Sequence, residues 1–380
     1  MTRLSILMAC YMQEKYLEEA IDSVLKSGFD FRDSEIIMWD DCSTDRTWEI
    51  IQDYGRRYPD IIRPFRSESN MGVADCAAAM VNTARGKYVM IFDHDDVLLP
   101  FDIAGELDFL DKNSDYVASY GRKLMFDEEK GLHGRSMGGP YSDFLMILHP
   151  PINNNALIIR RETALAVGNF KSTREGKLSG AADIFMWLRL RLAGKLRYDN
   201  ASPRLLHRIH KKQVTQRDNQ SDVYVRDYRF FLDYMIERYP SVYEKLSSGK
   251  EMRFSNEETF AALIMLGGMI RNTDQAQDLD RFLFYAKQLA PEDPAVDQQI
   301  GEFMFNLKHY EDAAFKFFDI YIKFEDDYHR LISLSWLTKA YEKLERPIDY
   351  LRAGAVRVSS RYFSLSPENR RILMNVRRYK

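Results

Sequence analysis

The stretch that decides the fold reads YVMIFDHDD and spans residues 88–96. Its five apolar residues are typical of a strand that is covered on both faces, and an acidic cluster follows directly at the strand's carboxyl end. Two similar apolar runs precede it, at residues 4–9 and 35–39, with amphipathic helical patterns between them. This β-α-β-α-β order predicts an α/β domain with a mainly parallel, Rossmann-like sheet and helices on both sides.

Carboxylate clusters follow two of the predicted strands. Asp40 and Asp41 end the second strand, and Asp93, Asp95 and Asp96 end the third. Ligands of open α/β sheets bind beyond the carboxyl ends of the strands, where like charges repel unless a cation or a donor offsets them. Aspartate is also a common turn and capping residue, so one cluster alone would favour a structural role. Two clusters on neighbouring strands favour a ligand site.

The alternation of Asp93 and Asp95 indicates metal chemistry. Alternate carboxylates at a strand end can hold Mg²⁺ or Mn²⁺, which are hard cations that prefer oxygen ligands. Such an ion can bridge the two phosphates of a nucleoside diphosphate and neutralise the charge that builds on a leaving group. The sequence therefore predicts a divalent-metal site beside a nucleotide.

The chain as a whole has the composition of a folded protein. Its 380 residues exceed one ordinary hydrophobic core, and a hydrophobic content of 45% argues against disorder. Acidic and basic residues are mixed and leave a net charge of −3, which argues against a nucleic-acid partner. No apolar run approaches the ~20 residues needed to cross a bilayer. Cys10, Cys42 and Cys76 lack metal-type spacing and are predicted to be free thiols of a cytoplasmic protein.

The pattern of the sequence changes near residue 223. Strand patterns end there, and helical periodicity takes over with a weak repeat of roughly 34–37 residues. This part resembles degenerate tetratricopeptide repeats, and an irregular helical bundle with chance spacing is the alternative. We therefore predict a first domain at residues 1–220 and an all-α domain at residues 221–380. Stacked helices of this kind are expected to bind a substrate chain or a partner protein, or to mediate self-association.

The last segment, residues 370–380, carries basic residues beside apolar ones. As a helix it could rest on an anionic membrane surface, which predicts peripheral contact with the inner face of the membrane. The alternative is an ordinary solvated terminal helix that packs on the last repeat.

Seven elements within residues 1–216 resemble, in order and spacing, the motifs of glycosyltransferase family two, which has the GT-A fold. They are SILMACY with EKYL (5–17), WDDCSTD (39–45), NMG (70–72), FDHDD (92–96), GNF (168–170), ADIFMWLRL (182–190) and HRIH (207–210).

The resemblance implies residues that bind the nucleotide-sugar. They are Ala9, Tyr11, Glu14, Asp40, Asp41, Asn70, Asp93 and His94. Among them, Ala9, Tyr11 and Glu14 would line the base and the ribose. Asp40 or Asp41 would accept a hydrogen bond from the base, as a carboxylate facing the N3–H of uracil can do.

The resemblance also implies roles in the chemistry. Asp93 would face the ribose or the donor sugar and share the metal with Asp95. His210 would be a further metal or diphosphate ligand, and a packed strand residue is the alternative. Asp183 would be the general base that takes the proton of an acceptor hydroxyl, and an ordinary aspartate at a helix N-terminus is the alternative.

The sequence departs from the family pattern at several positions. Ala9 and Met12 stand where the family usually has Pro and Asn, and Cys42 replaces Gly. Ala182 replaces the acidic neighbour of the base, and residues 76–78 replace an Ala-Arg-Asn run, so any donor contact through that Arg is absent. These departures weaken the site assignment more than the fold assignment.

The resemblance predicts an inverting glycosyltransferase. It would move a sugar from a nucleotide-sugar, with UDP favoured, to a hydroxyl of a glycan or cell-surface polymer, as in polysaccharide biosynthesis. The alternative is a catalytically silent repeat scaffold that retains a degenerate GT-A domain. A sugar-nucleotide pyrophosphorylase would open with a Gly-rich phosphate loop after the first strand, and residues 11–14, YMQE, do not form one.

Overall fold

The computed structural model describes residues 2–127, 131–148, 151–170, 182–210, 231–248, 254–271, 276–324 and 327–344. The predicted basic segment 370–380 and the predicted domain boundary at 220 lie outside these residues. The chain divides into two units by its internal contacts: residues 1–141 with 149–234, and residues 142–148 with 235–380.

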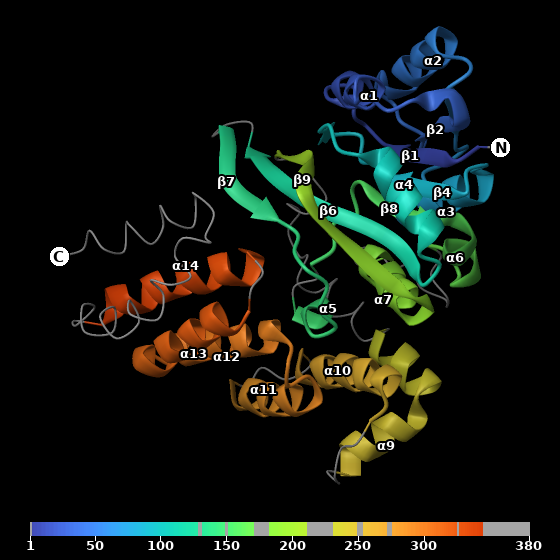
Figure 1. Cartoon of the computed structure of the whole chain (residues 1–380). Coiled ribbons are helices and arrows are strands. Elements are labelled where there is room, and N and C mark those ends of the chain that lie inside the picture. The colour runs from blue at the N-terminus through green and yellow to red at the C-terminus, as the bar shows by residue number, and fades with distance from the viewer. Residues whose placement is uncertain are drawn as a thin grey trace. The chain divides into compact units, whose positions relative to one another are not determined.

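The first unit begins with alternating strands and helices. They are β1 (Leu4–Cys10), α1 (Leu17–Leu25), a 3₁₀ turn (Phe31–Asp33), β2 (Ser34–Asp40), α2 (Thr47–Arg57), β3 (Ile62–Arg66), α3 (Val73–Thr83) and β4 (Tyr88–Ile91). The four strands are parallel and lie in the order β3-β2-β1-β4 (Figure 1). The three predicted strands and the two predicted helices are confirmed, and the structure adds β3 and α3 between α2 and β4, which were not predicted from the sequence.

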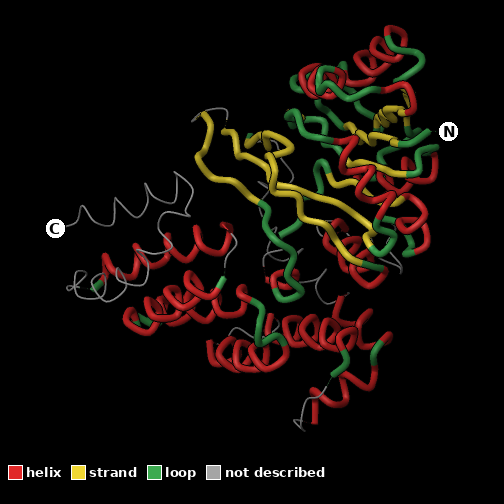
Figure 2. The backbone as a smooth tube through the Cα atoms, in the orientation of Figure 1, coloured by secondary structure: helices red, strands yellow, loops and turns green. Residues whose placement is uncertain are grey.

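The sheet continues with strands that are far apart in the sequence. The remaining elements of this unit are β5 (Val97–Leu98), α4 (Ile103–Lys112), β6 (Tyr116–Asp127), β7 (Gly131–Met137), β8 (Leu157–Arg160), α6 (Arg161–Ala166), α7 (Ala182–Ala193) and β9 (Lys195–Ile209). The order beyond β4 is β8-β6-β9-β5, and β7 pairs with β6. β8 is antiparallel to both its neighbours, whereas β6 and β9 run parallel to each other as two long strands (Figure 2).

Alternate residues of the strands belong to two apolar layers. Ile6 and Met8 pack in one buried cluster with residues of α1, α2 and α4. Leu7 between them is equally buried but lies outside that cluster, and α3 packs against β1 and β2. This alternation follows from the period of two in a strand and puts helices on both faces of the sheet, as expected. Each fully buried Leu or Ile contributes roughly 1.5–3 kcal/mol.

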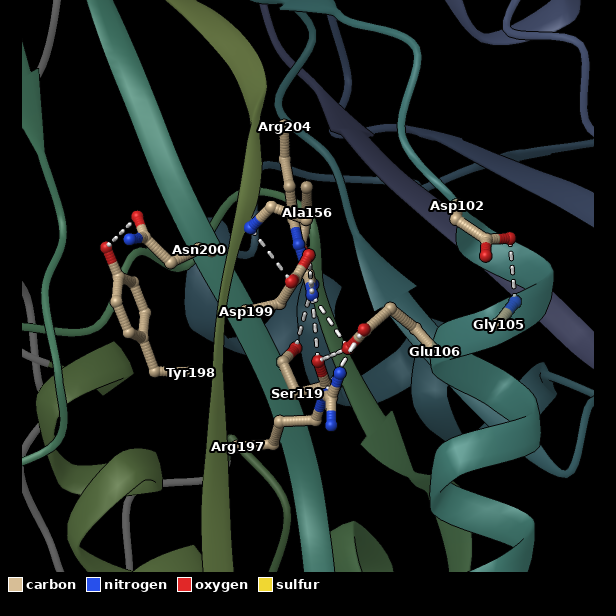
Figure 3. A network of polar contacts seen from close by, with 12 residues as sticks. Asp102, Gly105, Glu106, Ser119, Ala156, Arg197, Tyr198, Asp199, Asn200 and Arg204 are labelled. Atoms are coloured by element: carbon tan, nitrogen blue, oxygen red, sulfur yellow. Dashed lines mark hydrogen bonds and ion pairs between the residues drawn. The ribbon is translucent and has the colours of Figure 1, made fainter. Parts of the chain in front are cut away.

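A buried arginine joins the second half of the sheet to α4 (Figure 3). The side chain of Arg204 on β9 is 1% exposed and donates to the Glu106 carboxylate at 2.9 Å. It also donates to the Ser119 hydroxyl at 2.8 Å and to the carbonyl of Ala156 at 3.0 Å. A Cβ atom at residue 121 would lie 2.6 Å from the Arg204 Nε, so only Gly121 leaves room for this side chain.

The second unit is all-α in its described residues. It contains α5 (Leu145–Leu148), α9 (Pro240–Ser248), α10 (Asn256–Arg271), α11 (Ala276–Leu289), α12 (Pro294–Asn306), α13 (Tyr310–Lys323) and α14 (Asp327–Lys343). Residues 231–238, at the junction of the two units, are also helical. Consecutive helices from α9 to α14 contact one another. The buried Asp297 carboxylate joins three of them through Lys287 at 2.8 Å and Lys316 at 3.0 Å. The helical C-terminal region is confirmed, and its likeness to tetratricopeptide repeats stays a prediction.

A helix that crosses a bilayer must be long and predominantly apolar. Among the helices of the described residues, none is both long enough and apolar enough to cross a bilayer.

Candidate active site

The carboxyl ends of β1, β2 and β4 meet at one edge of the sheet. Cys10 of β1 is in register with Asp40 of β2, and Leu7 is in register with Ile91 of β4. The residues that follow each strand are therefore neighbours. One direct contact is the Nδ1 of His94, which meets the carbonyl oxygen of Ala9. The topology thus brings the predicted residues of all three strand ends to the same edge.

The loop after β1 is fastened to the loop after β2. The backbone amides of Met12, Gln13 and Glu14 donate to side chains of residues 43–47 at 2.8–3.2 Å. The Glu14 carboxylate in turn accepts the backbone N–H of Arg46 at 3.1 Å. The ring of Tyr11 is 43% exposed at the start of this loop and can pack against a ligand.

The two loops contain backbone conformations that explain the family pattern. Met12 has φ 55° and Cys42 has φ 64°, both in the left-handed region. Asn and Gly adopt this region most readily, and these are the residues that the family usually has there. The substitutions therefore keep the loop geometry at the expense of local strain, of order 1–3 kcal/mol each.

Asp40 and Asp41 connect the end of β2 to the end of β3 and to the segment that follows it. The Asp40 carboxylate is fully buried and pairs with the Arg66 Nε at 3.1 Å. The Asp41 carboxylate accepts the backbone N–H groups of Met71 and Gly72, each at 2.8 Å. It thereby orders the loop that carries the exposed Asn70 ahead of α3. A carboxylate has about four acceptor positions, so the contacts of Asp41 leave acceptor positions unused, whereas the fully buried Asp40 also accepts the Ser43 backbone N–H at 3.3 Å.

The acidic loop after β4 brings three carboxylates together. One ligand atom each from Asp93, Asp95 and Asp96 lies within 4.8 Å of the others. Burial, together with the negative charges of Asp96 and Asp95, raises the pKa of Asp93 to about 6. Burial would also raise the pKa of Asp95, but the nearby His94 and His210 outweigh it and the pKa is lowered. A hard divalent cation would offset the excess negative charge, so these oxygen ligands suit Mg²⁺ or Mn²⁺.

Asp96 already accepts hydrogen bonds from several groups of the protein, whereas Asp93 and Asp95 have fewer side-chain contacts of this kind. The Asp96 side chain is fully buried and accepts from the Asn155 amide, the His207 Nδ1 at 3.1 Å and the Arg208 backbone N–H at 2.9 Å. This set of donors makes Asp96 an anchor that ties β9 and the loop before β8 to the acidic loop. Asp93 and Asp95 are therefore the carboxylates best placed to hold a metal.

His210 lies next to this pair. Its Nε2 is 3.0 Å from the Asp95 Oδ2, and its ring centroid is 4.8 Å from that of Tyr16. The side chain is only 4% exposed. A packed strand residue and a metal ligand would both occupy this position, so the position agrees with either role.

Asp183 begins α7, with residues 171–181 before it outside the described part of the chain. Its carboxylate accepts the backbone N–H of Ile184 at 2.8 Å, and its negative charge is favourable in the first turn of a helix. Its charge also acts on Lys123 of β6, together with those of Asp93 and Asp96. Lys123 therefore lies among the acidic loop and the start of α7.

Sequence reasoning missed three residues that shape this site. They are Lys123, Asn155 and His207. His207 begins the HRIH element, and Asn155 ends a run of three asparagines directly before a strand, so both had a signal. Asn155 accepts the backbone N–H of Asp93 at 3.1 Å and donates to Asp96, which needs the fold to be seen. Lys123 had no sequence signal at all.

Comparison with known proteins identifies the first domain. Residues 5–175 match the family model described as Glycosyl transferase family 2. The N-terminal part of the chain is thus similar to this family over the matched residues. A curated relative is the putative glycosyltransferase EpsE of Bacillus subtilis, which is 27% identical over 187 residues, or 49% of this chain and 66% of EpsE. Another is the poly(ribitol-phosphate) beta-N-acetylglucosaminyltransferase TarS of Staphylococcus aureus, 27% identical over 144 residues, or 38% of this chain and 23% of TarS. The chain thus spans less than two thirds of either relative.

Solved structures show the same fold around the glycosyl transferase domain. A crystal structure of S. aureus TarS in complex with UDP-GlcNAc matches with a TM-score of 0.50 and 17% identity, covering 78% of this chain and 83% of that one. The mannosyltransferase PcManGT from Pyrobaculum calidifontis, in complex with GDP-Man and Mn²⁺, matches with a TM-score of 0.50 and 14% identity, covering 93% of this chain and 86% of that one. At these identities the likeness shows the GT-A fold with its helical extension.

Proposed function

We propose that this protein is an inverting, metal-dependent glycosyltransferase that moves a sugar from a UDP-sugar to a hydroxyl of a glycan or cell-surface polymer. The observation that carries the proposal is the meeting of Asp93 and Asp95 at the carboxyl edge of the sheet. The charges of Asp93 and Asp183 also act on the same residue, Lys123. UDP is favoured because the TarS structure contains UDP-GlcNAc, and a polymer acceptor because TarS is named for poly(ribitol-phosphate).

The residues of this chain divide the work. Ala9, Tyr11 and Glu14 form one wall for the base and ribose, and Asp40 or Asp41 accepts from the base. Asp93 and Asp95, with His210, hold Mn²⁺ or Mg²⁺. When bound, such a cation neutralises the charge of a diphosphate leaving group.

Asp183 supplies the remaining step. An acceptor hydroxyl must lose its proton as its oxygen attacks the anomeric carbon. The Asp183 carboxylate takes that proton as a general base, and no covalent intermediate with the protein is needed. A single displacement of this kind inverts the anomeric centre.

The helical unit is assigned to binding. Phe284, Leu307 and Phe315 are 51–69% exposed on or beside its helices α11, α12 and α13. Exposed apolar side chains on a helical array suit an acceptor chain or a partner protein.

The test is ligand-dependent stability of the full chain. UDP at about 100 times its Kd adds about 2.7 kcal/mol to the folded state. We expect UDP with Mn²⁺ to raise the Tm by roughly 5–10 °C, and UDP with EDTA to raise it far less. Asp95→Ala should abolish the difference, whereas Asp60→Ala, at an exposed position of the same domain, should keep it.

Two outcomes would contradict the proposal. Equal stabilisation with Mn²⁺ and with EDTA would remove the metal from it. Absence of any stabilisation by UDP, with no UDP released from UDP-GlcNAc, would favour the silent scaffold with a degenerate GT-A domain.

A further inference from the structure

Lys123 lies at an irregular point of β6. The register between β6 and β9 shifts on both sides of Arg122, directly before Lys123 pairs with Leu205. Register shifts of this kind, β-bulges among them, frequently border active sites, because they turn a side chain away from its regular direction. Lys123 is half-buried there, between β7 and β9.

The surroundings of Lys123 are acidic but do not hold it. Burial lowers the pKa of Lys123, and the carboxylates of Asp96, Asp93 and Asp183 act in the opposite direction. No hydrogen bond or ion pair joins its ammonium group to any of the described residues. The three carboxylates are therefore near enough to act through their charge and too far for direct contact.

An unpaired, half-buried ammonium is costly for the protein to keep. A charge taken out of water destabilises the fold unless a partner compensates it. A lysine with a purely structural role would be expected to reach one of the three carboxylates and form an ion pair. Because Lys123 makes no such pair with the described residues, an anionic group of a ligand would supply the partner that its ammonium lacks.

We propose that the Lys123 ammonium binds a phosphate oxygen of a substrate, between the metal-binding carboxylates and Asp183. The chemical class is a phosphate, because an ammonium is a compact charge that suits a phosphate oxygen. Two sources offer that group: the diphosphate of the donor, and a phosphate of a polyol-phosphate acceptor. The inference rests on the proposed function and adds a substrate-binding residue to the same site.

The experiment compares Lys123→Met and Lys123→Arg with the wild type in the full chain. Lys112→Met is the control, because Lys112 is an exposed lysine at the end of α4 in the same domain. Three probes are titrated and followed by calorimetry: UDP with Mn²⁺, inorganic pyrophosphate with Mn²⁺, and poly(ribitol phosphate) alone.

A lost charge-assisted contact weakens binding by about ten- to a hundredfold. If the donor supplies the phosphate, Lys123→Met weakens UDP and pyrophosphate by that factor and leaves the polymer unchanged. If the acceptor supplies it, the same variant weakens only the polymer. In both cases Lys123→Arg retains binding within about threefold, Lys112→Met has no effect, and Lys123→Met raises the Tm of the ligand-free protein because a buried charge is gone.

The result that overturns the inference is distinct from failure of the proposed function. If Lys123→Met binds all three probes as the wild type does, or if the wild type binds none of them, Lys123 is no phosphate ligand. If the wild type binds pyrophosphate and Lys123→Met does not, while UDP fails to bind, the lysine site stands and the UDP-sugar assignment falls.

Discussion

The carboxylate network around Glu106 and the acidic cluster after β4 balance their negative charges in opposite ways. Glu106 on α4 pairs with Arg204 at 2.9 Å and with Arg197 at 3.2 Å, so its charge is balanced inside the chain (Figure 3). Asp93, at the carboxyl end of β4, has Asp95 and Asp96 as its neighbours, and its pKa is raised to about 6. The first set is complete without a ligand, whereas the second gains from a cation. The balance of charge thus distinguishes a group that supports the fold from the candidate functional site.

The two sets are also connected. Arg204 donates to the carbonyl of Ala156, whose neighbour Asn155 contacts both Asp93 and Asp96. Ala156 itself has φ 57°, a conformation that needs support from its surroundings. The balanced network therefore holds the loop that positions the unbalanced site.

The largest expected effect is a loss of sugar-transfer rate with little change in folding stability. Asp183→Asn keeps size and hydrogen bonding but removes basicity, so transfer to the acceptor should fall about 10²–10⁴-fold. UDP affinity should stay within about twofold, and stability should change by less than about 1 kcal/mol. Steady-state rates and thermal unfolding measure both.

Glu162→Gln is the matched control for Asp183→Asn, because Glu162 is also an acidic residue in a first helical turn of this domain. If Asp183→Asn behaves like this control, with transfer within about tenfold of the wild type, the base lies elsewhere.

The second effect is a loss of folding stability that comes from the buried Glu106–Arg204 ion pair, away from the candidate site. Arg204→Met leaves Glu106 as a buried charge with a single, more exposed partner, which should destabilise the fold by about 3–5 kcal/mol. Arg197→Met should cost about 1 kcal/mol or less, because Arg197 is 31% exposed and its pair is screened. Denaturant unfolding of the two variants tests this. Adding Glu106→Gln to Arg204→Met should restore part of the loss, and no recovery would mean that packing, not charge, sets the effect.

The third effect tests the link between the two sets. Asn155→Ala removes a donor to Asp96 and the acceptor of the Asp93 amide, so Mn²⁺ affinity in the presence of UDP should fall about 10–100-fold. Asn153→Ala is the control, because Asn153 is an equally buried asparagine that bonds Gly121 and Met137 instead. Mn²⁺ titration should separate the variants even where their Tm values agree. Equal loss in both would make the loop a general support.

The sequence predicted three of the four parallel strands and missed β3 (Ile62–Arg66), whose residues IRPFR include two arginines and a proline. Residues 4–9, 35–39 and 88–92 were expected to be strands, and the structure has Leu4–Cys10, Ser34–Asp40 and Tyr88–Ile91. β9 was recognised only in its HRIH end. Its earlier part reads KLRYDNASPR, and a polar stretch like this becomes a strand only because β6 and α4 supply partners from distant sequence.

The site divides in the same way. The alternation of carboxylates after an apolar strand predicted a shared site for Asp93 and Asp95, and the resemblance to the family implied that His210 belongs to it. The roles of Lys123 and Asn155 depend on a bulge and on a loop contact across 59–62 residues of chain, which no local pattern encodes.

The smallest expected effect is a pH-dependent change in stability that comes from Asp93. It tests directly whether the negative charge of the acidic cluster is unbalanced within the chain. The folded-state pKa of Asp93, about 6, lies above the ordinary aspartate value of about 3.9. Between these values the folded chain binds more protons than the unfolded chain, so stability is present at low pH and is lost as the pH rises through 6. Asp93→Asn cannot ionise and escapes that loss.

Without metal, Asp93→Asn should therefore melt above the wild type at pH 7.5, on the order of a few degrees higher. The difference should grow between about pH 4 and pH 6.5 and stay constant above that range. With Mn²⁺ and UDP the order should reverse, because the wild type gains a ligand that the variant cannot hold. Asp60→Asn, at an exposed position, should show neither trend. If Asp93→Asn is instead less stable than the wild type at pH 7.5 without metal, Asp93 is balanced inside the chain as Glu106 is, and charge no longer distinguishes the site from the scaffold.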